Sequence, residues 1–183
     1  MEVSSFCQTE TVVHKGLEGL RRLRHLGLGL LWWGLAAAPR GMGKANAWPH
    51  GEERARLLAA SELLHQTGIS FVAIVLVGLG GGRFYEAHVE ATTSLLKELN
   101  PPGVAFSDLV VVPGTPYTRL VEKGILEVLS PERMAVQRRA FEQIALTAPQ
   151  YDYEANGSKV RLRCTHTAVV APLAAAFQPH PRT

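Results

Sequence analysis

The glycine-rich segment Gly41–Lys44 is the first place where this sequence could bind a phosphate group. A phosphate-binding loop also needs a glycine at position 38 and a Ser or Thr at position 45, so that backbone N–H groups and a hydroxyl hold the phosphate and its metal ion. The sequence has Ala38 and Ala45 at these two positions. We therefore interpret the segment as a flexible turn.

A second glycine-rich segment, Gly78–Arg83, follows an apolar run that reads as a strand and precedes a helical pattern. This is the place where α/β proteins bind ligands through backbone N–H groups. The dinucleotide fingerprint needs a glycine at position 83, where this sequence has Arg83. The segment is interpreted either as a ligand-facing loop or as a simple tight turn.

Cysteine and histidine residues offer a poor set of metal ligands and nucleophiles. Cys164, His166, His180 and Cys7 could be gathered into one site, but the C-x-H spacing is not a zinc spacing. The seven histidines have no Ser or Cys partner positioned to make a nucleophile system. We therefore expect no metal site and no catalytic residue.

Asp108 is a carboxylate inside the apolar run 103–112, in register with valines and a phenylalanine. A carboxylate on a buried strand must be paired or hydrogen-bonded. Asp108 is therefore expected either to bond to a neighbouring loop or to point into a ligand cavity.

The overall composition indicates one globular domain. The 183 residues are 46% hydrophobic and 19% charged, with a net charge of +3 and no block of basic residues. We therefore expect no nucleic-acid partner, and the apolar runs are too short to span a membrane. The N-terminus shows no signal peptide and the two cysteines do not form a disulfide framework, so we interpret the chain as cytoplasmic.

Strands and helices alternate along the chain, which predicts an α/β fold built from parallel βα units. Three strands are expected, at residues 30–34, 69–78 and 103–112. Because three parallel strands leave two unpaired edges, we expect part of a (β/α) barrel rather than a finished sheet.

The two ends of the chain lack clear periodicity. Residues 1–14 are expected to be disordered, and residues 15–148 to form the βα domain. Residues 149–183 are expected to form a poorly ordered tail, in which a strand at 159–164 and a hairpin across 155–158 are possible arrangements.

Three stretches of this sequence resemble the C-terminal half of the radical S-adenosylmethionine (SAM) enzyme core. They are "LEGLRRLRHLGLGLLWWGL" followed by "GMGK", "SELLHQTGISFVAIVLVGLGG", and "FSDLVVVPGTPYTRLVEKG". In order, they look like the family's fourth, fifth and sixth strands with their neighbouring helices and loops. The resemblance covers residues 16–146.

The resemblance implies a partial barrel whose strand ends bind SAM. In the family a Glu-Ser pair after the fourth strand helps to hold SAM, whereas this chain has Ala36 and Ala37, which cannot make those polar contacts. Gly81 likewise stands where the family has a glutamate. The cofactor-binding residues predicted in this way are Gly34, Ala36, Gly78, Gly80, Asp108, Val112, Pro113 and Gly114.

The family also binds a [4Fe–4S] cluster through C-x-x-x-C-x-x-C, and that motif does not occur in this sequence. The resemblance therefore implies SAM and a cluster in the family, while neither is supported by the residues of this chain. The first hypothesis is a truncated, inactive portion of a radical SAM enzyme, prone to self-association through an exposed sheet edge. The second is a non-catalytic module that docks on an N-terminal half-barrel partner carrying the cluster. The third is an α/β protein with an unrelated ligand at residues 78–82.

Overall fold

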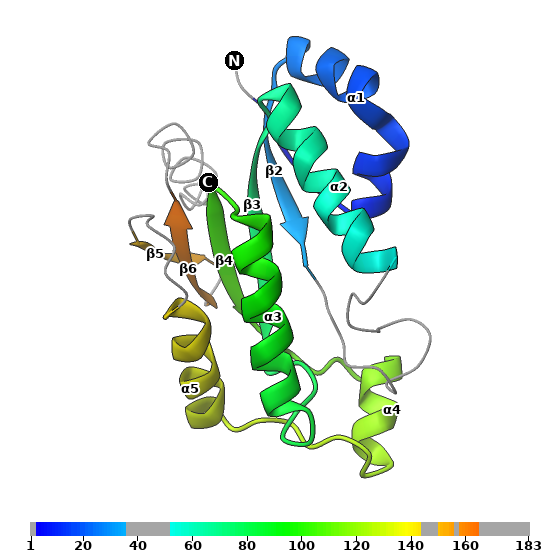
Figure 1. The fold of residues 1–183 in the computed structure, drawn as a ribbon. Coiled ribbons are helices and arrows are strands. Elements are labelled where there is room, and N and C mark those ends of the chain that lie inside the picture. The colour runs from blue at the N-terminus through cyan, green and yellow to red at the C-terminus, as the bar shows by residue number, and fades with distance from the viewer. Residues whose placement is uncertain (1–2, 36–51, 144–149, 156–157, 165–183) are drawn as a thin grey trace, which may run out of the picture.

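The structure of this chain is a computed structural model that describes residues 3–35, 52–143, 150–155 and 158–164. One sheet runs through the described residues (Figure 1). Its strands lie in the order β1-β2-β3-β4-β6-β5. They are β1 (Val3–Cys7), β2 (Leu28–Gly34), β3 (Ser70–Val77), β4 (Gly103–Asp108), β5 (Gln150–Ala155) and β6 (Ser158–Cys164).

The first four strands are parallel, and each is joined to the next by a segment that contains a helix. β6 then pairs antiparallel with β4, and β5 pairs antiparallel with β6. The helices are α1 (Thr9–His25), α2 (Glu52–Thr67), α3 (Tyr85–Leu99), α4 (Pro116–Glu122) and α5 (Pro131–Glu142). The chain thus has an α/β fold with the arrangement of a partial (β/α) barrel.

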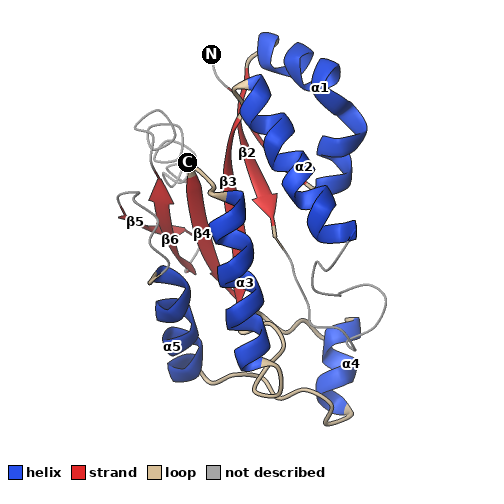
Figure 2. Ribbon diagram, in the orientation of Figure 1, coloured by secondary structure: helices blue, strands red, loops and turns tan. Residues whose placement is uncertain are grey.

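Helices α1, α2, α3 and α5 cover one face of the sheet (Figure 2). Local sequence explains where several of them begin and end. The hydroxyl of Ser130 accepts the N–H of Arg133 at the start of α5, and Pro131 occupies the first helical position. α3 ends where Asn100 takes a left-handed conformation, just before two prolines.

The main core lies between the sheet and these helices. Alternate residues of β2, β3 and β4 point into it, because side chains alternate between the two faces of a strand. The Trp33 and Phe71 rings meet edge to face at 5.4 Å, and the Phe106 and Phe141 rings stack at 6.2 Å. All four side chains are fully buried, so aromatic packing joins β2 to β3 and β4 to α5.

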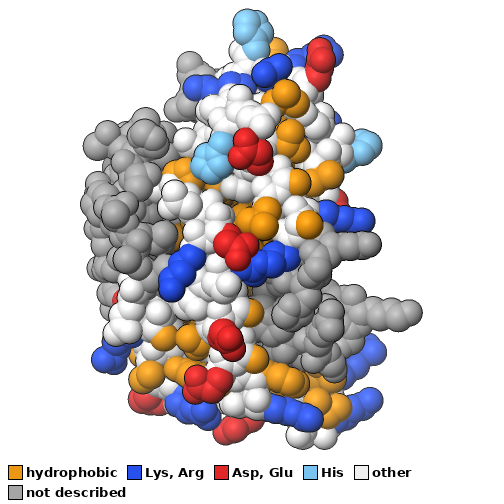
Figure 3. Space-filling model, in the orientation of Figure 1, with side chains coloured by type: hydrophobic (Ala, Val, Ile, Leu, Met, Phe, Trp, Pro, Cys, Tyr) orange, Lys and Arg blue, Asp and Glu red, His pale blue; other side chains and the backbone are white. Residues whose placement is uncertain are grey.

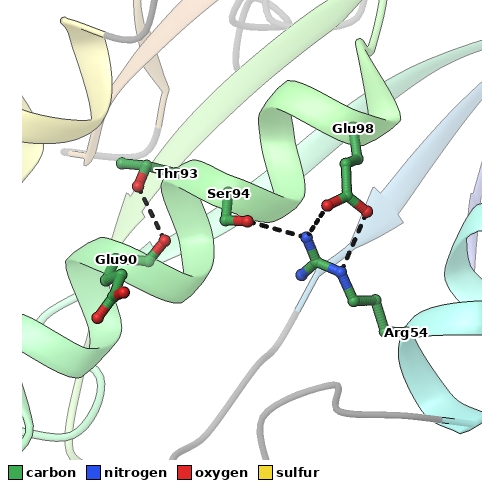
Figure 4. Close-up of polar contacts among 5 residues, drawn as sticks. All are labelled: Arg54, Glu90, Thr93, Ser94 and Glu98. Atoms are coloured by element: carbon green, nitrogen blue, oxygen red, sulfur yellow. Dashed lines mark hydrogen bonds and ion pairs between the residues drawn. The ribbon is translucent and has the colours of Figure 1, made fainter.

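Polar contacts at the surface join neighbouring helices. Arg54 on α2 donates to both carboxylate oxygens of Glu98 on α3, at 2.5 and 3.1 Å, and to the hydroxyl of Ser94 at 3.0 Å (Figure 4). The hydrogen bonds from Arg54 lower the pKa of Glu98. Because this ion pair is exposed to solvent, it adds little to the free energy of unfolding, and its main effect is to align α2 with α3.

Charges of both signs are interspersed on the helix-covered face of the molecule (Figure 3). Among the described residues, no helix combines the length and apolar character that crossing a bilayer requires.

Several sequence predictions differ from this structure. Residues 1–14 were expected to be disordered, but this segment contains β1 and the start of α1. The sequence of β1 has no clear hydrophobic periodicity, and the strand is ordered by its parallel pairing with β2. The parallel sheet has four strands rather than three. The strand expected at 103–112 ends at Asp108.

The tail also contains more structure than predicted. β5 and β6 form a hairpin in which Ala155 pairs with Ser158, which agrees with the arrangement considered across residues 155–158. β6 is ordered by pairing with β4, a long-range contact that local sequence does not reveal. Residues 165–183 lie outside the described residues.

Replacing Phe141 by Ala should test the aromatic core. The substitution Phe141→Ala removes a fully buried ring and should lower the free energy of unfolding by about 3–5 kcal/mol in urea denaturation. Val136→Ala on the same helix is the control, because Val136 is 54% exposed and should change stability by less than about 0.5 kcal/mol. Equal effects of the two substitutions would contradict this packing.

Candidate functional site

The four parallel strands end at one edge of the sheet, at the bottom of Figure 1. In open α/β sheets and barrels, ligands bind at this carboxyl edge. Backbone pairing continues just past two of the strands, since the N–H of Leu35 donates to the Ile74 carbonyl at 2.9 Å and that of Leu109 to the Val77 carbonyl at 2.8 Å. Among the described residues, the candidate site is therefore formed by the carboxyl ends of β1 and β2 and by the loops that follow β3 and β4.

The loop after β3 is held from inside the protein. The buried N–H of Gly78 donates to Oε1 of Gln137 on α5 at 2.7 Å. Gly78 has φ +90°, and a Cβ there would lie 3.0 Å from the Met134 sulfur. Gly81 has φ +59°, and a Cβ there would lie 1.9 Å from the carbonyl oxygen of Glu127. The glycines therefore allow this loop to pack closely against α5 and the segment before it.

Two further buried polar side chains face the same loop. His88 on α3 is 2% exposed, and burial lowers the pKa of its imidazole to about 4, although Gln137 and the Leu79 carbonyl favour the charged form. Tyr117 on α4 is 9% exposed, and burial raises the pKa of its phenol, while the Gly80 backbone opposes that shift. The loop is thus contacted by side chains from α3, α4 and α5.

This arrangement limits what the loop can do chemically. The N–H of Gly78 already has a protein acceptor, so it does not point out as a free donor toward a phosphate or carboxylate. His88 is neutral at physiological pH and buried, which suits it to a structural role beside the loop. The structure favours a rigid turn that shapes the carboxyl edge.

The predicted site residues fall into two groups. Gly78 and Gly80 are buried in the loop after β3. Gly34, Asp108, Val112, Pro113 and Gly114 are exposed at the ends of β2 and β4. Ala36 lies outside the described residues. All the described members of the set lie on the carboxyl-edge loops or strand ends, and their role in binding a cofactor stays a prediction.

The predicted burial of Asp108 is wrong. The strand ends at this residue, and its side chain is 50% exposed. Its carboxylate is ion-paired with Arg138 on α5, which also donates to the Phe106 carbonyl at 3.4 Å. Arg138 thereby fastens α5 to the last residues of β4, near the point where the pairing with β6 ends at Phe106.

The described residues do not fit an iron–sulfur cluster. Cys7, at the carboxyl end of β1, is half-buried, and burial raises the pKa of its thiol to about 12. Cluster ligands are thiolates, so a protonated buried thiol is unsuited to that role. Within the described ranges, no three His, Cys, Asp or Glu side chains come together in a way that could hold a metal ion.

The sequence did not reveal the residues that support the loop. His88, Gln137 and Tyr117 are not among the predicted site residues. Helix α4 was not predicted, although its start has a Thr-Pro signature: the Thr115 hydroxyl accepts the N–H of Thr118 at 3.3 Å and Pro116 follows at the first helical position.

Comparison with solved structures places this fold beside one radical SAM enzyme. The chain superimposes on the radical S-adenosylmethionine methyltransferase TsrM from Kitasatospora setae, solved with its tryptophan substrate and the SAM analogue aza-SAM, with a TM-score of 0.52 and 18% sequence identity. The match covers 98% of this chain and 36% of the methyltransferase chain, so this chain spans about a third of that protein's length. At this identity the likeness concerns the fold alone. No protein-family model and no curated protein matches the chain.

Replacing Gly81 by Ala should test the close packing of the loop. Gly81→Ala should destabilise the protein by about 3 kcal/mol or more, because the new methyl group meets the Glu127 carbonyl in addition to straining the backbone. Gly114→Ala is the matched control: Gly114 has φ +80° but open space around it, so the cost should stay near 1–2 kcal/mol. Equal losses in urea denaturation would show that the loop does not pack against Glu127.

Stability should depend on pH through His88. Its pKa of about 4 in the folded protein lies below the ordinary 6.5, so between these values the unfolded chain binds more protons and the folded state loses stability as pH falls. The loss attributable to His88 between pH 7 and pH 4 is roughly 3 kcal/mol. The variant His88→Gln should lack this part of the pH dependence. Parallel stability–pH curves for the two proteins would contradict the buried, neutral imidazole.

Proposed function

We propose that this chain is a portion of a radical SAM-type core that does not perform radical chemistry as an isolated polypeptide. The observation that carries the proposal is the superposition of nearly the whole chain on a third of a radical SAM methyltransferase. Except for "GMGK", which lies outside the described residues, the three sequence stretches that resemble the family lie on β2, β3 and β4 with their neighbouring helices.

Within such a core, the carboxyl-edge loops would contact SAM. The exposed residues Gly34, Asp108 and Gly114 would lie toward the ligand. The loop after β3, whose Gly78 N–H is bound by Gln137, would support the site without changing conformation. Asp108, half exposed and paired with Arg138, would present one carboxylate at this edge, which could accept a hydrogen bond from the ammonium of an amino acid moiety.

The cluster chemistry has no support in this chain. A [4Fe–4S] cluster supplies the electron that cleaves SAM, and the family holds it with three cysteines of one motif. The sequence has two cysteines, Cys7 and Cys164, far apart in the chain, and the Cys7 thiol is stabilised in its protonated form. We therefore propose no reaction step for the isolated polypeptide.

A second candidate function is a binding module for a polypeptide that carries the cluster ligands. The asymmetry of the sheet favours it. At one end of the parallel strands, β4 is paired with β6. At the other end, β1 is paired with β2, and no described strand lies along the outer edge of β1. Further parallel strands could therefore be added beside β1, the side on which earlier βα units of a barrel would lie. The third hypothesis, an unrelated ligand at residues 78–82, is weakened by the internal bonding of that loop.

Two measurements on the purified chain test the proposed function. Titration with SAM in a calorimeter should give no heat above dilution, and anaerobic incubation with iron and sulfide should leave no cluster absorbance after desalting. A radical SAM enzyme with an intact C-x-x-x-C-x-x-C motif, treated in the same way, is the positive control. Retention of a stoichiometric cluster, or of SAM with micromolar affinity, would overturn the proposal of an inactive portion.

A further inference from the structure

The described helices that pack on the sheet lie on one of its two faces. Trp33 on β2 and Phe71 on β3 belong to the core beneath these helices, and the side chains of a strand alternate between its two faces. Their neighbours in the sequence, Trp32 and Val72, therefore point to the opposite face, as Ala105 does on β4. We call the face that bears Trp32, Val72 and Ala105 the second face. Helix α4 lies at the carboxyl edge of the sheet (Figure 2).

The second face is buried although no described helix lies across it. Val72 is 0% exposed, Ala105 3%, Leu30 4% and Trp32 7%. Phe6 on β1 shares this face, since it is paired with Trp32 and the two rings lie 6.1 Å apart, yet Phe6 is 76% exposed. The second face is therefore shielded from water over β4, β3 and β2, and it is open at β1.

The C-terminal segment of the chain begins beside the shielded part of this face. Trp32, Val72 and Gly103 pair in one row across β2, β3 and β4. Cys164, the last residue of β6, pairs with Gly103 and so ends that row. The chain continues from there to Thr183. Three strand spacings separate β6 from β2, about 15 Å in all, which about five extended residues can cross.

Residues 168–177 have the composition that an apolar face requires. Their sequence, Ala-Val-Val-Ala-Pro-Leu-Ala-Ala-Ala-Phe, contains no charged and no polar side chain. The segment 36–51, which also lies outside the described residues, contains Arg40 and Lys44 and follows β2 at the carboxyl edge. Because an unpaired charge is costly to bury, charge as well as position favours residues 168–177 as the segment that covers the second face.

We propose that residues 168–177 pack across the second face, from β4 to Trp32 on β2. Removing the apolar side chains of both partners from water favours this contact. In a closed (β/α) barrel the same face would line the interior, where side chains or a ligand fill the space. The segment would occupy that space within this chain, so a ligand or a partner that completes the barrel would have to displace it. The inference does not depend on the proposed function, because it concerns two parts of this chain.

Acrylamide quenching of Trp32 fluorescence in the full chain tests this inference. The variant Trp48→Phe leaves two tryptophans, of which Trp33 is fully buried on the helix-covered face and should stay inaccessible. In this background, Leu173→Asp should raise the quenching constant roughly twofold or more, because a carboxylate is costly to bury and displaces the segment from Trp32. Gln178→Asp, just beyond the apolar residues, is the matched control and should leave the quenching constant unchanged. Circular dichroism checks that both variants keep the fold.

Nuclear Overhauser effects in the unsubstituted chain provide a second readout that does not rely on a variant. The methyl groups of residues 168–177 should show these effects to the indole of Trp32. Equal quenching constants for folded Leu173→Asp and Gln178→Asp would overturn the inference. An indole of Trp32 that shows no contact with residues 168–177, or that contacts residues 36–51 instead, would overturn it as well.

Discussion

The hydrogen bond between the Gly78 N–H and the Gln137 side chain connects the loop after β3 with helix α5. Gly78 begins the loop after β3, and Gln137 lies on α5, which follows β4 and packs against α3. A buried amide donor left without an acceptor would cost roughly 1–3 kcal/mol, so α5 and the loop must be placed together. Glu127 and Met134 then leave no room for side chains at Gly81 and Gly78. The shape of the carboxyl edge therefore depends on α5 as much as on the strands.

Local sequence was sufficient to predict the alternating βα architecture. β3 is apolar and β-branched on both faces, and the strand expected at 69–78 differs by one residue at each end from the observed Ser70–Val77. Errors occurred where order comes from distant partners. β1 is short and half polar, and it is defined by pairing with β2. β6 is defined by pairing with β4. Asp108 was expected to be buried because it is in register with valines and a phenylalanine, but the strand ends there and Arg138 from α5 supplies its partner.

The sequence predicted where the candidate site lies, but it did not predict which side chains support it. Its glycines and strand ends could be located from the sequence, since parallel strands must end at one edge. The supporting side chains could not, because His88, Tyr117 and Gln137 come from three helices and meet only in the folded chain. The two lateral edges of the parallel sheet are also unlike: β4 continues into an antiparallel hairpin, whereas no described strand pairs with the outer edge of β1. The structure thus combines a rigid, internally bonded loop with a sheet that has different neighbours on its two sides.

Amide hydrogen exchange at Gly78 and Gly80, followed by NMR with and without SAM, tests the central claim that the loop after β3 is held by the protein itself. The account predicts that the Gly78 amide exchanges only through global unfolding, and that SAM alone changes neither amide. A Gly78 amide that exchanges rapidly in the free chain and becomes protected when SAM is added would contradict the account, because the loop would then be a ligand cradle that orders on binding.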